Sequence, residues 1–311
     1  MSIKSAIAPA VHWLGLASGH SLRAARAQQA TRIITFHGVG VPDCAADVFE
    51  AHLEFLCKNF NVVPLARIVE RLLRKEPPAA DEIALTFDDG LRNNLTVAYP
   101  LLKKYRAPAV FFLVPGLIDA ERWLWVHEAR ERLRTLAPDR ASALAAPLGF
   151  PADSGDVVAW MKTLPLAQRQ RVEAEIRAAT PGFAPTSQHR LMFDLMNWDE
   201  VRLLDPELVT IGAHSVTHPI LANSTAEELV QEIDGCRPML EQRIGRPVNF
   251  FCYPNGDFNP AVLARAREAY QAAVIVKAGF VKPGHDLHQL PRINNAHALP
   301  LFAWRLHRPT A

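Results

Sequence analysis

The sequence lacks any run of about 20 consecutive apolar residues, the length that a helix needs to cross a bilayer. Residues 7–16 are apolar and follow Lys4, as in a weak signal peptide, but Pro9 and His12 interrupt them and no convincing cleavage site follows. We therefore expect a cytoplasmic protein in which residues 1–30 form an N-terminal helical extension. The apolar stretch leaves export open, as well as peripheral contact with a membrane.

Cysteine is scarce, and the four cysteines form no Cys-x-x-Cys pair. Their spacing disfavours a zinc site built from thiolates and is typical of free thiols in a reducing compartment. The formal net charge is only +2 and no basic stripe alternates with aromatic residues, so we expect no nucleic-acid partner. What is present is an ordinary globular composition, in which 49% hydrophobic residues are ample for a large core.

Short apolar, β-branched runs recur along the chain, and most are followed by a loop and then by a helical pattern. They lie at residues 32–36, 83–87, 109–114, 209–213, 248–252 and 273–276. Near-continuous apolar strands of this kind are typical of a parallel sheet that is covered on both faces. Their alternation with helices predicts an α/β fold.

Helical patterns fill the intervals between these strands. Residues 47–60 carry apolar side chains at helical spacing, Ser224-x-x-Glu227 matches a capping box, and Asn259-Pro260 predicts an N-cap followed by a first-turn proline. Residues 117–198 lack the strand pattern, and we expect them to form a large helical insertion of the kind that adjusts substrate binding. The expected organisation is therefore one domain at 31–300, containing this insertion, and a C-terminal tail at 301–311.

Two of the predicted strands lead into the most informative residues. The second leads into Asp88 and Asp89, and the fourth leads into His214 and His218. Taken singly, Asp-Asp-Gly is a common turn, and two histidines four residues apart are often surface residues. Together, one carboxylate and two imidazoles make an open divalent-metal site, and a helical turn would bring both rings to one ion. The second carboxylate is then free to act as a base on a water molecule.

Further polar residues also follow strand-like runs, at the end where reactive groups gather in parallel α/β folds. His37 is either a satisfied core histidine or part of a substrate pocket. Tyr253 lies in a turn whose backbone N–H groups could face a developing oxyanion, while its ring could form a wall of the substrate site. Arg292 either orients Asp88 by a charge-assisted hydrogen bond or lies at the surface. Trp125 is expected in the core.

These motifs resemble those of the NodB-homology polysaccharide deacetylases, a family of carbohydrate esterases. Residues 86–90 are similar to the first motif of that family, His214-Ser215-x-x-His218 is similar to the second, and residues 251–256 are similar to a Tyr-Pro-x-Gly form of the third. The similarity extends over about residues 33–295. Residues 34–39 and 88–94 resemble the subgroup that is found with exopolysaccharide biosynthesis.

The resemblance implies a distorted (β/α)7 barrel and a divalent metal, usually Zn²⁺. It also implies removal of acetyl groups from N-acetylated sugars of a polysaccharide or glycan precursor. By position, Asp88 would be the base, while Asp89, His214 and His218 would be the metal ligands. Two departures are visible. The arginine that opens the third motif in many members is missing, with Arg292 as a candidate substitute, and the fifth-motif histidine that supplies the general acid has no clear counterpart.

Two alternative functions stay open. The same site could hydrolyse an O-acetyl ester or a small amide, because an ester needs less protonation of its leaving group. The chain could instead be a glycan-binding protein whose catalytic apparatus has decayed. The presence of Asp88 and a complete set of candidate ligands argues against that second alternative.

Overall fold

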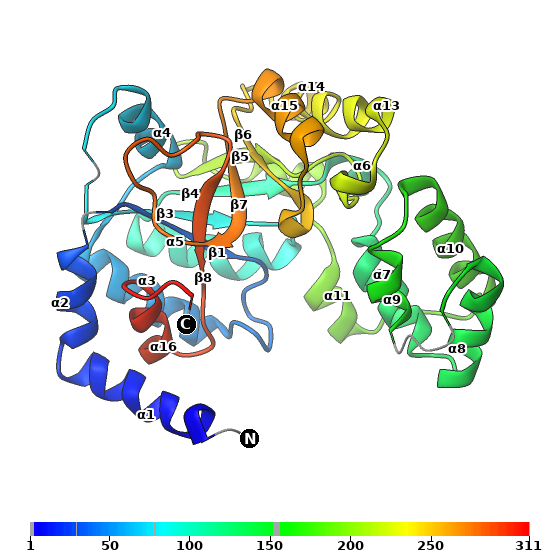
Figure 1. The fold of residues 1–311 in the computed structure, drawn as a ribbon, viewed down its shortest axis with the longest axis horizontal. Helices are drawn as coiled ribbons and strands as arrows, with labels where there is room; N and C mark the ends of the chain where they lie inside the picture. Colours follow the sequence, from blue (N-terminus) through cyan, green and yellow to red (C-terminus); the bar gives the residue numbers. More distant parts are fainter. Residues whose placement is uncertain (1–2, 29, 78, 152–155, 311) are drawn as a thin grey trace.

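The computed structural model describes residues 3–28, 30–77, 79–151 and 156–310, and Figure 1 shows its ribbon. The strands are β1 Arg32–Phe36, β2 Asn61–Val62, β3 Glu82–Phe87, β4 Ala109–Leu113, β5 Val209–Ala213, β6 Phe250–Cys252, β7 Ala272–Ala278 and β8 Leu290–Asn294. The α-helices are α1 Ile3–Ala17, α2 His20–Ala27, α3 Ala46–Asn59, α4 Leu65–Leu73, α5 Tyr99–Tyr105, α6 Pro115–Asp119, α7 Trp125–Leu133, α8 Pro138–Ala145, α9 Val157–Met161, α10 Leu166–Ala179, α11 Ser187–Phe193, α12 Trp198–Arg202, α13 Ala226–Leu229, α14 Cys236–Ile244, α15 Pro260–Ala269 and α16 Leu299–Arg305. Short π- or 3-10-helical segments are η1 Asn94–Ala98, η2 Ala146–Leu148, η3 Leu221–Asn223, η4 Val230–Asp234 and η5 Pro254–Gly256.

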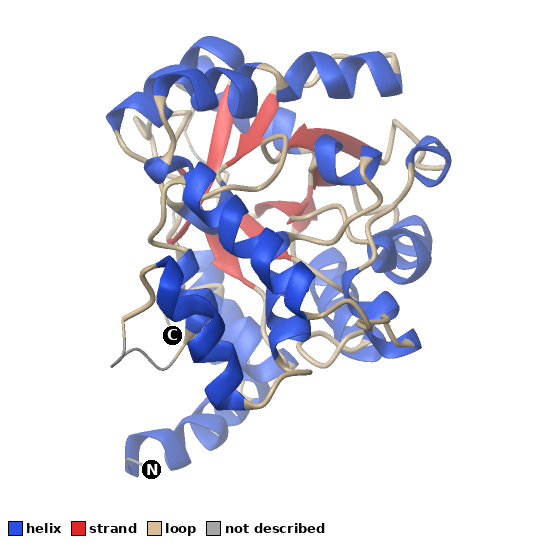
Figure 2. Cartoon of the chain, turned by 90° about the vertical axis from the view of Figure 1, so that its right-hand side faces the viewer, coloured by secondary structure: helices blue, strands red, loops and turns tan. Residues whose placement is uncertain are grey.

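The strands form a closed parallel barrel. Their order is β1-β8-β7-β6-β5-β4-β3, and β1 also pairs with β3, so that the sheet closes on itself with seven strands. The short strand β2 adds to the edge of β3. Helices enclose the strands on the outside, as Figure 2 shows. The predicted α/β barrel of the (β/α)7 type is confirmed.

Alternating side chains of the strands pack into two different layers. One set, which includes Phe36 and Phe87, packs outward against Phe49 and Leu53 of α3. The other set comes from strands on all sides of the barrel and fills its interior, as listed here: Ile33, Ala84, Val110, Phe112, Phe250, Val274 and Leu290. Because both faces of each strand are covered, β1, β3 and β4 are buried over their whole length. This double burial is why the strands read as continuous apolar runs in the sequence.

Between β4 and β5 the chain forms the helices α6 to α12, over the region predicted as an insertion at 117–198. Residues 152–155 of that region lie outside the described residues. Helices α7 to α10 stand beside the barrel on the right of Figure 1 and have their own buried cluster, which includes Trp125, Phe150, Met161 and Ile176. One side of this helical group borders the carboxyl ends of the strands.

The two ends of the chain meet on the opposite flank of the barrel. The region predicted as a helical extension, 1–30, contains α1 and α2, with residues 1–2 and 29 outside the described part. The C-terminal residues expected as a tail instead include most of α16, which packs on α1 and buries Phe302 and Leu306 completely. The tail prediction failed because a helix this short gives little periodic signal. None of the helices in the described ranges is long and apolar enough to span a bilayer.

Candidate metal centre and substrate pocket

Asp88 and Asp89 stand where β3 leaves the barrel. The Asp88 N–H donates to the carbonyl of Phe36 at 3.0 Å, which ties the start of this loop to β1. The backbone then turns through left-handed conformations at Asp89, with φ of 74°, and at Gly90, with φ of 70°. A Cβ atom on Gly90 would also lie 2.8 Å from Leu113, so only glycine fits at this position. The turn directs the two neighbouring carboxylates to different partners.

His214 and His218 follow β5 in a loop, not on the helical turn that their spacing suggested. The loop has left-handed residues at Ser215, with φ of 60°, and at His218, with φ of 57°. The Ser215 hydroxyl accepts a hydrogen bond from the His218 N–H at 3.0 Å. Thr217 donates from its backbone N–H and its hydroxyl to the Glu232 carboxylate, at 2.8 and 2.5 Å. A non-helical loop therefore brings the two rings together, with centroids 4.8 Å apart.

Asp89, His214 and His218 converge on one point. The Asp89 Oδ1 atom lies 3.5 Å from the Nε2 atoms of both histidines, and one ligand atom from each residue falls within 4.8 Å of the others. The His214 Nδ1–H donates to the carbonyl of Cys252 at 2.7 Å, which fixes the tautomer and leaves its Nε2 lone pair for a metal. Burial, followed by the neighbouring His214, lowers the pKa of His218 to about 3 and keeps that ring neutral, the form that binds metals.

A second group of possible ligands, Asp88, His214 and Cys252, lies beside the first. It is the poorer metal site for three reasons. Arg292 already holds both oxygens of Asp88. Burial raises the pKa of the Cys252 thiol and so disfavours the thiolate that binds metals. The Nδ1 atom of His214 is occupied by its hydrogen bond to the Cys252 carbonyl. The set Asp89, His214 and His218 therefore fits a divalent ion better.

Asp88 is hydrogen-bonded to Arg292, the contact that was one of the two predictions for this arginine. The guanidinium donates to Oδ1 at 2.7 Å and to Oδ2 at 2.8 Å, and it also contacts Thr86 Oγ1 and Cys252 Sγ, at 3.2 and 3.3 Å. Arg292 is completely buried. Burial by itself raises the pKa of Asp88, but the charge and hydrogen bonds of Arg292 outweigh it and hold the pKa below its usual value. Asp88 is thus kept ionised beside the candidate metal site.

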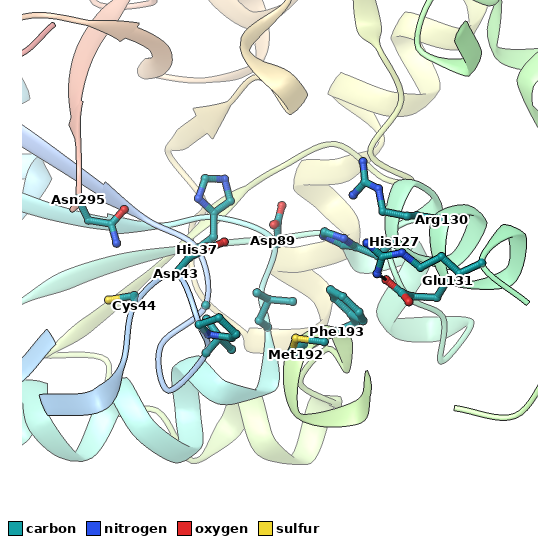
Figure 3. Close-up of a pocket in the computed structure, with 15 residues that line it drawn as sticks. His37, Asp43, Cys44, Asp89, His127, Arg130, Glu131, Met192, Phe193 and Asn295 are labelled. Carbon is teal, nitrogen blue, oxygen red and sulfur yellow. Dashed lines mark hydrogen bonds and ion pairs between the residues drawn. The ribbon is translucent and has the colours of Figure 1, made fainter. Parts of the chain in front are cut away.

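A cavity of about 510 Å³ opens beside these residues, and Asp89 is the candidate ligand that lines it. Its lining includes Asp89, His37 and Asn295 from barrel loops and His127, Arg130 and Phe193 from the helical insertion. Figure 3 shows His37 on one side of Asp89 and His127 on the other. His37 is therefore a pocket residue rather than a core residue, with its side chain 57% exposed and its Nε2 atom 3.9 Å from Asp88 Oδ2. The His127 ring is stacked on Phe193, with centroids 4.5 Å apart.

The Tyr253 side chain does not form a wall of this pocket, contrary to the prediction. Its ring is fully buried between Phe251 and Phe258, and its hydroxyl donates to the carbonyl of His288 at 3.0 Å. The phenol is a core group because the turn after β6 directs it away from the carboxyl ends of the strands. The predicted role of the backbone near Tyr253 as an oxyanion site is not affected by this correction.

Three groups near the site were not anticipated from the sequence: His127, Cys252 and the indole of Trp125. Trp125 is buried as expected, but its Nε1–H also donates to the carbonyl of His218 at 2.9 Å, so the insertion holds a candidate ligand in place. No local motif marks His127 or Trp125, because their contacts depend on how the insertion folds back onto the barrel. Cys252 sits directly before the Tyr-Pro turn, and its position as the last residue of a predicted strand was the available signal.

The family model described as "Polysaccharide deacetylase" matches residues 75–274, which is most of the chain and contains both candidate motifs. The chain belongs to the polysaccharide deacetylase family. The family resemblance of the motifs is thereby confirmed. Two curated relatives from Bacillus subtilis, YxkH and YlxY, are 31% and 27% identical over 84 and 104 residues. These matches cover 27% and 32% of this chain, and only 30% and 33% of the relatives' own lengths.

Several solved structures resemble this chain in fold. The deacetylase PplD of Streptococcus pyogenes aligns with a TM-score of 0.62 at 17% identity, covering 90% of this chain and 99% of PplD. IcaB of Ammonifex degensii aligns with a TM-score of 0.59 at 15% identity, covering 89% of this chain and 98% of IcaB. The deacetylase domain of BpsB from Bordetella bronchiseptica aligns with a TM-score of 0.55 at 17% identity, covering 86% of this chain and 96% of the BpsB domain. At these identities the likeness establishes the barrel and no more.

Proposed function

We propose that this protein removes acetyl groups from N-acetylated sugars of a polysaccharide or glycan precursor, using Asp88 as the general base next to a divalent metal. The observation that carries the proposal is the contrast between two adjacent carboxylates. Arg292 holds Asp88 ionised, whereas Asp89 lies between two imidazoles and lines the pocket. Different surroundings of this kind give two neighbouring carboxylates separate roles, here one as a base and one as a metal ligand. The complex of the related PplD with acetate, the acid that deacetylation releases, supports this choice.

Asp89, His214 and His218 would hold the metal, most suitably Zn²⁺, since one carboxylate and two neutral imidazoles are its usual ligands in hydrolases. The His218 Nδ1 atom is buried and has no hydrogen-bond partner among the described residues, so this ring is not committed to another contact. When bound, the ion supplies a Lewis acid that polarises the acetyl carbonyl and lowers the pKa of water. The chain itself contributes an ionised base, a fixed tautomer of His214 and a walled cavity.

Asp88 takes the proton from the water that attacks the acetyl carbon. The C–N bond then breaks, acetate leaves with the new oxygen, and the amine nitrogen must gain a proton. His37 and His127 are the two imidazoles in the pocket lining. His37 is the better placed of the two to pass the proton on, because its Nε2 atom is 3.9 Å from Asp88 Oδ2. The pocket wall supplied by the insertion would bind the sugar.

The test measures metal content and acetate release from N-acetylglucosamine oligomers for the wild type and Asp88→Asn. We expect about one metal per chain in both proteins and loss of acetate release only in the variant, by roughly 10²- to 10⁴-fold. Asp199→Asn is the matched control, because this aspartate side chain is 91% exposed on α12. Asp88→Asn with full activity would refute the base assignment.

The same assay separates the alternative functions. O-acetylated sugars or small amides that release acetate when N-acetylglucosamine oligomers do not would move the assignment to those substrates. Sugar binding without turnover, in metal-replete wild type, would support a binding protein. His214→Ala should lose the metal, and a stoichiometric ion in that variant would refute the ligand set.

A further inference from the structure

The N-terminal helix α1 carries apolar residues on the face that is turned away from the protein. Ala10, Trp13, Leu14 and Ala17 follow one another at i, i+3, i+4 and i+7 and are all exposed. Trp13 and Leu14 are each 60% exposed, and the adjacent Val11 is 40% exposed. A surface helix normally places polar residues on its outer face. The exposed stripe on α1 is therefore unpartnered apolar surface.

The inner face of α1 is fixed against the C-terminal helix. The His12 ring contacts Trp304 of α16, with centroids 5.3 Å apart. A Cβ atom on Gly15 would lie 2.9 Å from the Ser21 hydroxyl and 3.0 Å from the Trp304 ring, so the backbone of α1 packs closely against these two side chains. In Figure 1, α1 runs below α16 at the lower edge of the molecule, and Figure 2 shows it there away from the strands. This packing determines which side of α1 faces outward.

The two terminal segments of the chain, to which α1 and α16 belong, are basic and contain no acidic residue. Residues 1–42 and 287–311 include no aspartate or glutamate at all. Exposed Arg23 and Arg26 lie on α2, and exposed Arg308 follows α16 with its guanidinium over the Trp304 ring at 5.4 Å. The net charge of the whole chain is only +2, so this acid-free flank is a local feature.

We propose that this flank, formed by the outer stripe of α1 with Arg23, Arg26 and Arg308, binds the surface of an anionic phospholipid bilayer. Tryptophan and leucine enter the boundary between headgroups and acyl chains, while arginine remains at the level of the phosphates. The charges select an anionic membrane, because each basic residue near such a surface adds attraction that neutral lipid does not give. Neither terminal segment of the flank contributes a carboxylate that would repel anionic lipid. The inference does not depend on the proposed function, since no residue of the metal centre takes part.

The test is co-sedimentation of the full-length protein with vesicles of phosphatidylcholine alone and of phosphatidylcholine containing phosphatidylglycerol. We expect binding to the anionic vesicles that weakens as salt is added, and little binding to neutral vesicles. Trp13→Gln/Leu14→Gln should lower the partition coefficient about tenfold or more. Arg23→Gln/Arg308→Gln should lower it on anionic vesicles by about fivefold for each arginine removed.

Leu203→Gln is the matched control, because Leu203 is an equally exposed leucine, 67%, that lies after α12 and away from α1. It should bind vesicles like the wild type. Equal binding of the wild type to neutral and anionic vesicles would overturn the proposal, and so would unchanged binding of both double variants. If the wild type is a dimer and Trp13→Gln/Leu14→Gln is a monomer that binds vesicles equally well, the stripe instead pairs two copies of the chain. Should the double variant unfold, the salt and lipid dependence of the wild type still decides.

Discussion

Arg292 and Asp88 form the contact on which the proposed chemistry depends most. Both are buried, and the guanidinium meets the carboxylate with two parallel hydrogen bonds. Such a fork fixes the orientation of the carboxylate as well as its charge. Arg292 comes from β8, whereas Asp88, the proposed base, follows β3, so a strand distant in sequence sets the orientation of this carboxylate. The position of the base is therefore a property of the closed barrel and not of its own loop.

Two substitutions of Arg292 separate its effect on the orientation of Asp88 from its effect on the ionisation of Asp88. Arg292→Lys keeps a charge but loses the fork, and we expect kcat/KM to fall roughly 10- to 100-fold with the metal retained. Arg292→Met leaves the buried carboxylate unpaired, so burial raises the pKa of Asp88 and the base stays protonated to a higher pH. The acidic limb of the kcat/KM profile should then move to higher pH. An acidic limb at the wild-type position in Arg292→Met would contradict this assignment.

His37 provides the corresponding prediction for the leaving group. An amine must be protonated as it leaves, whereas an alcohol leaves more readily. We expect His37→Phe to lower acetate release from an N-acetyl sugar by about 10²-fold or more and from an O-acetyl sugar by less than about tenfold. His127→Phe is the comparison, since this ring lines the same pocket at Phe193. A larger loss of amide hydrolysis in His127→Phe would transfer the donor role to that residue.

Among the helices and strands, those with a strong pattern were predictable and those with a conflicting pattern were not. The runs at 32–36 and 209–213 became β1 and β5 with the expected bounds, because they are apolar and buried on both faces. β8 was missed because it contains Pro291 and Arg292, which are unusual inside a strand. The charge of this buried arginine is paired there by Asp88, which follows a different strand. A partner that is distant in sequence leaves no trace in the local pattern.

The loops that make up the site show the same limit. The motifs Asp-Asp and His-x-x-x-His identified the candidate ligands in the sequence. They did not predict the left-handed backbone at Asp89 and His218 that makes the ligand side chains converge. The capping box near α13 was placed one residue early, since both Ser224–Glu227 and Thr225–Glu228 match the pattern. The structure uses Thr225, whose hydroxyl accepts from the Glu228 N–H at 3.3 Å while the Glu228 carboxylate accepts from the Thr225 N–H at 2.8 Å.

The insertion is joined to the candidate metal centre through α7, and Trp125 makes that connection. Trp125→Phe retains a ring in the cluster but removes the hydrogen bond to the His218 carbonyl. We expect the affinity for Zn²⁺ to fall about tenfold, as when outer partners of metal ligands are lost. The measurement is a competition titration with a chelator. Trp198→Phe is the control, because its indole bonds to Asp119 at 2.6 Å, outside the pocket lining. Equal affinities in both variants would mean that the insertion does not position the ligand loop.

At the scale of the whole molecule, the barrel and the acid-free flank meet at α3 and α16. His52 of α3 is fully buried and stacks on Phe302 of α16, with ring centroids 4.0 Å apart and planes inclined by 16°. The residue therefore reports on the docking of the C-terminal helix. Burial lowers the pKa of His52 to about 4. A hydrogen bond with the backbone of Ala298 raises this pKa, but by less than burial lowers it.

This shift determines how the folded state responds to acid. An unfolded histidine titrates near pH 6.5, so between about pH 6.5 and 4 the unfolded chain binds a proton that the folded chain does not. The free energy of unfolding should therefore decrease as the pH falls through that interval, by up to about 3 kcal/mol from His52 alone. His52→Phe, which retains an aromatic ring against Phe302, should lack this part of the decrease.

The difference between urea unfolding curves of the wild type and His52→Phe, measured from pH 7.5 to 4 (roughly the interval of histidine titration), isolates the contribution of His52. His127 and His307, whose pKa values burial also lowers, are present in both proteins, so their contributions cancel. We expect the variant to gain stability relative to the wild type as the pH decreases. A difference that stays constant with pH would mean that His52 is protonated, or solvated, in the folded protein. In that case α16 would not be docked on α3 in solution, and Arg308, which follows α16, would no longer belong to the proposed membrane-binding flank.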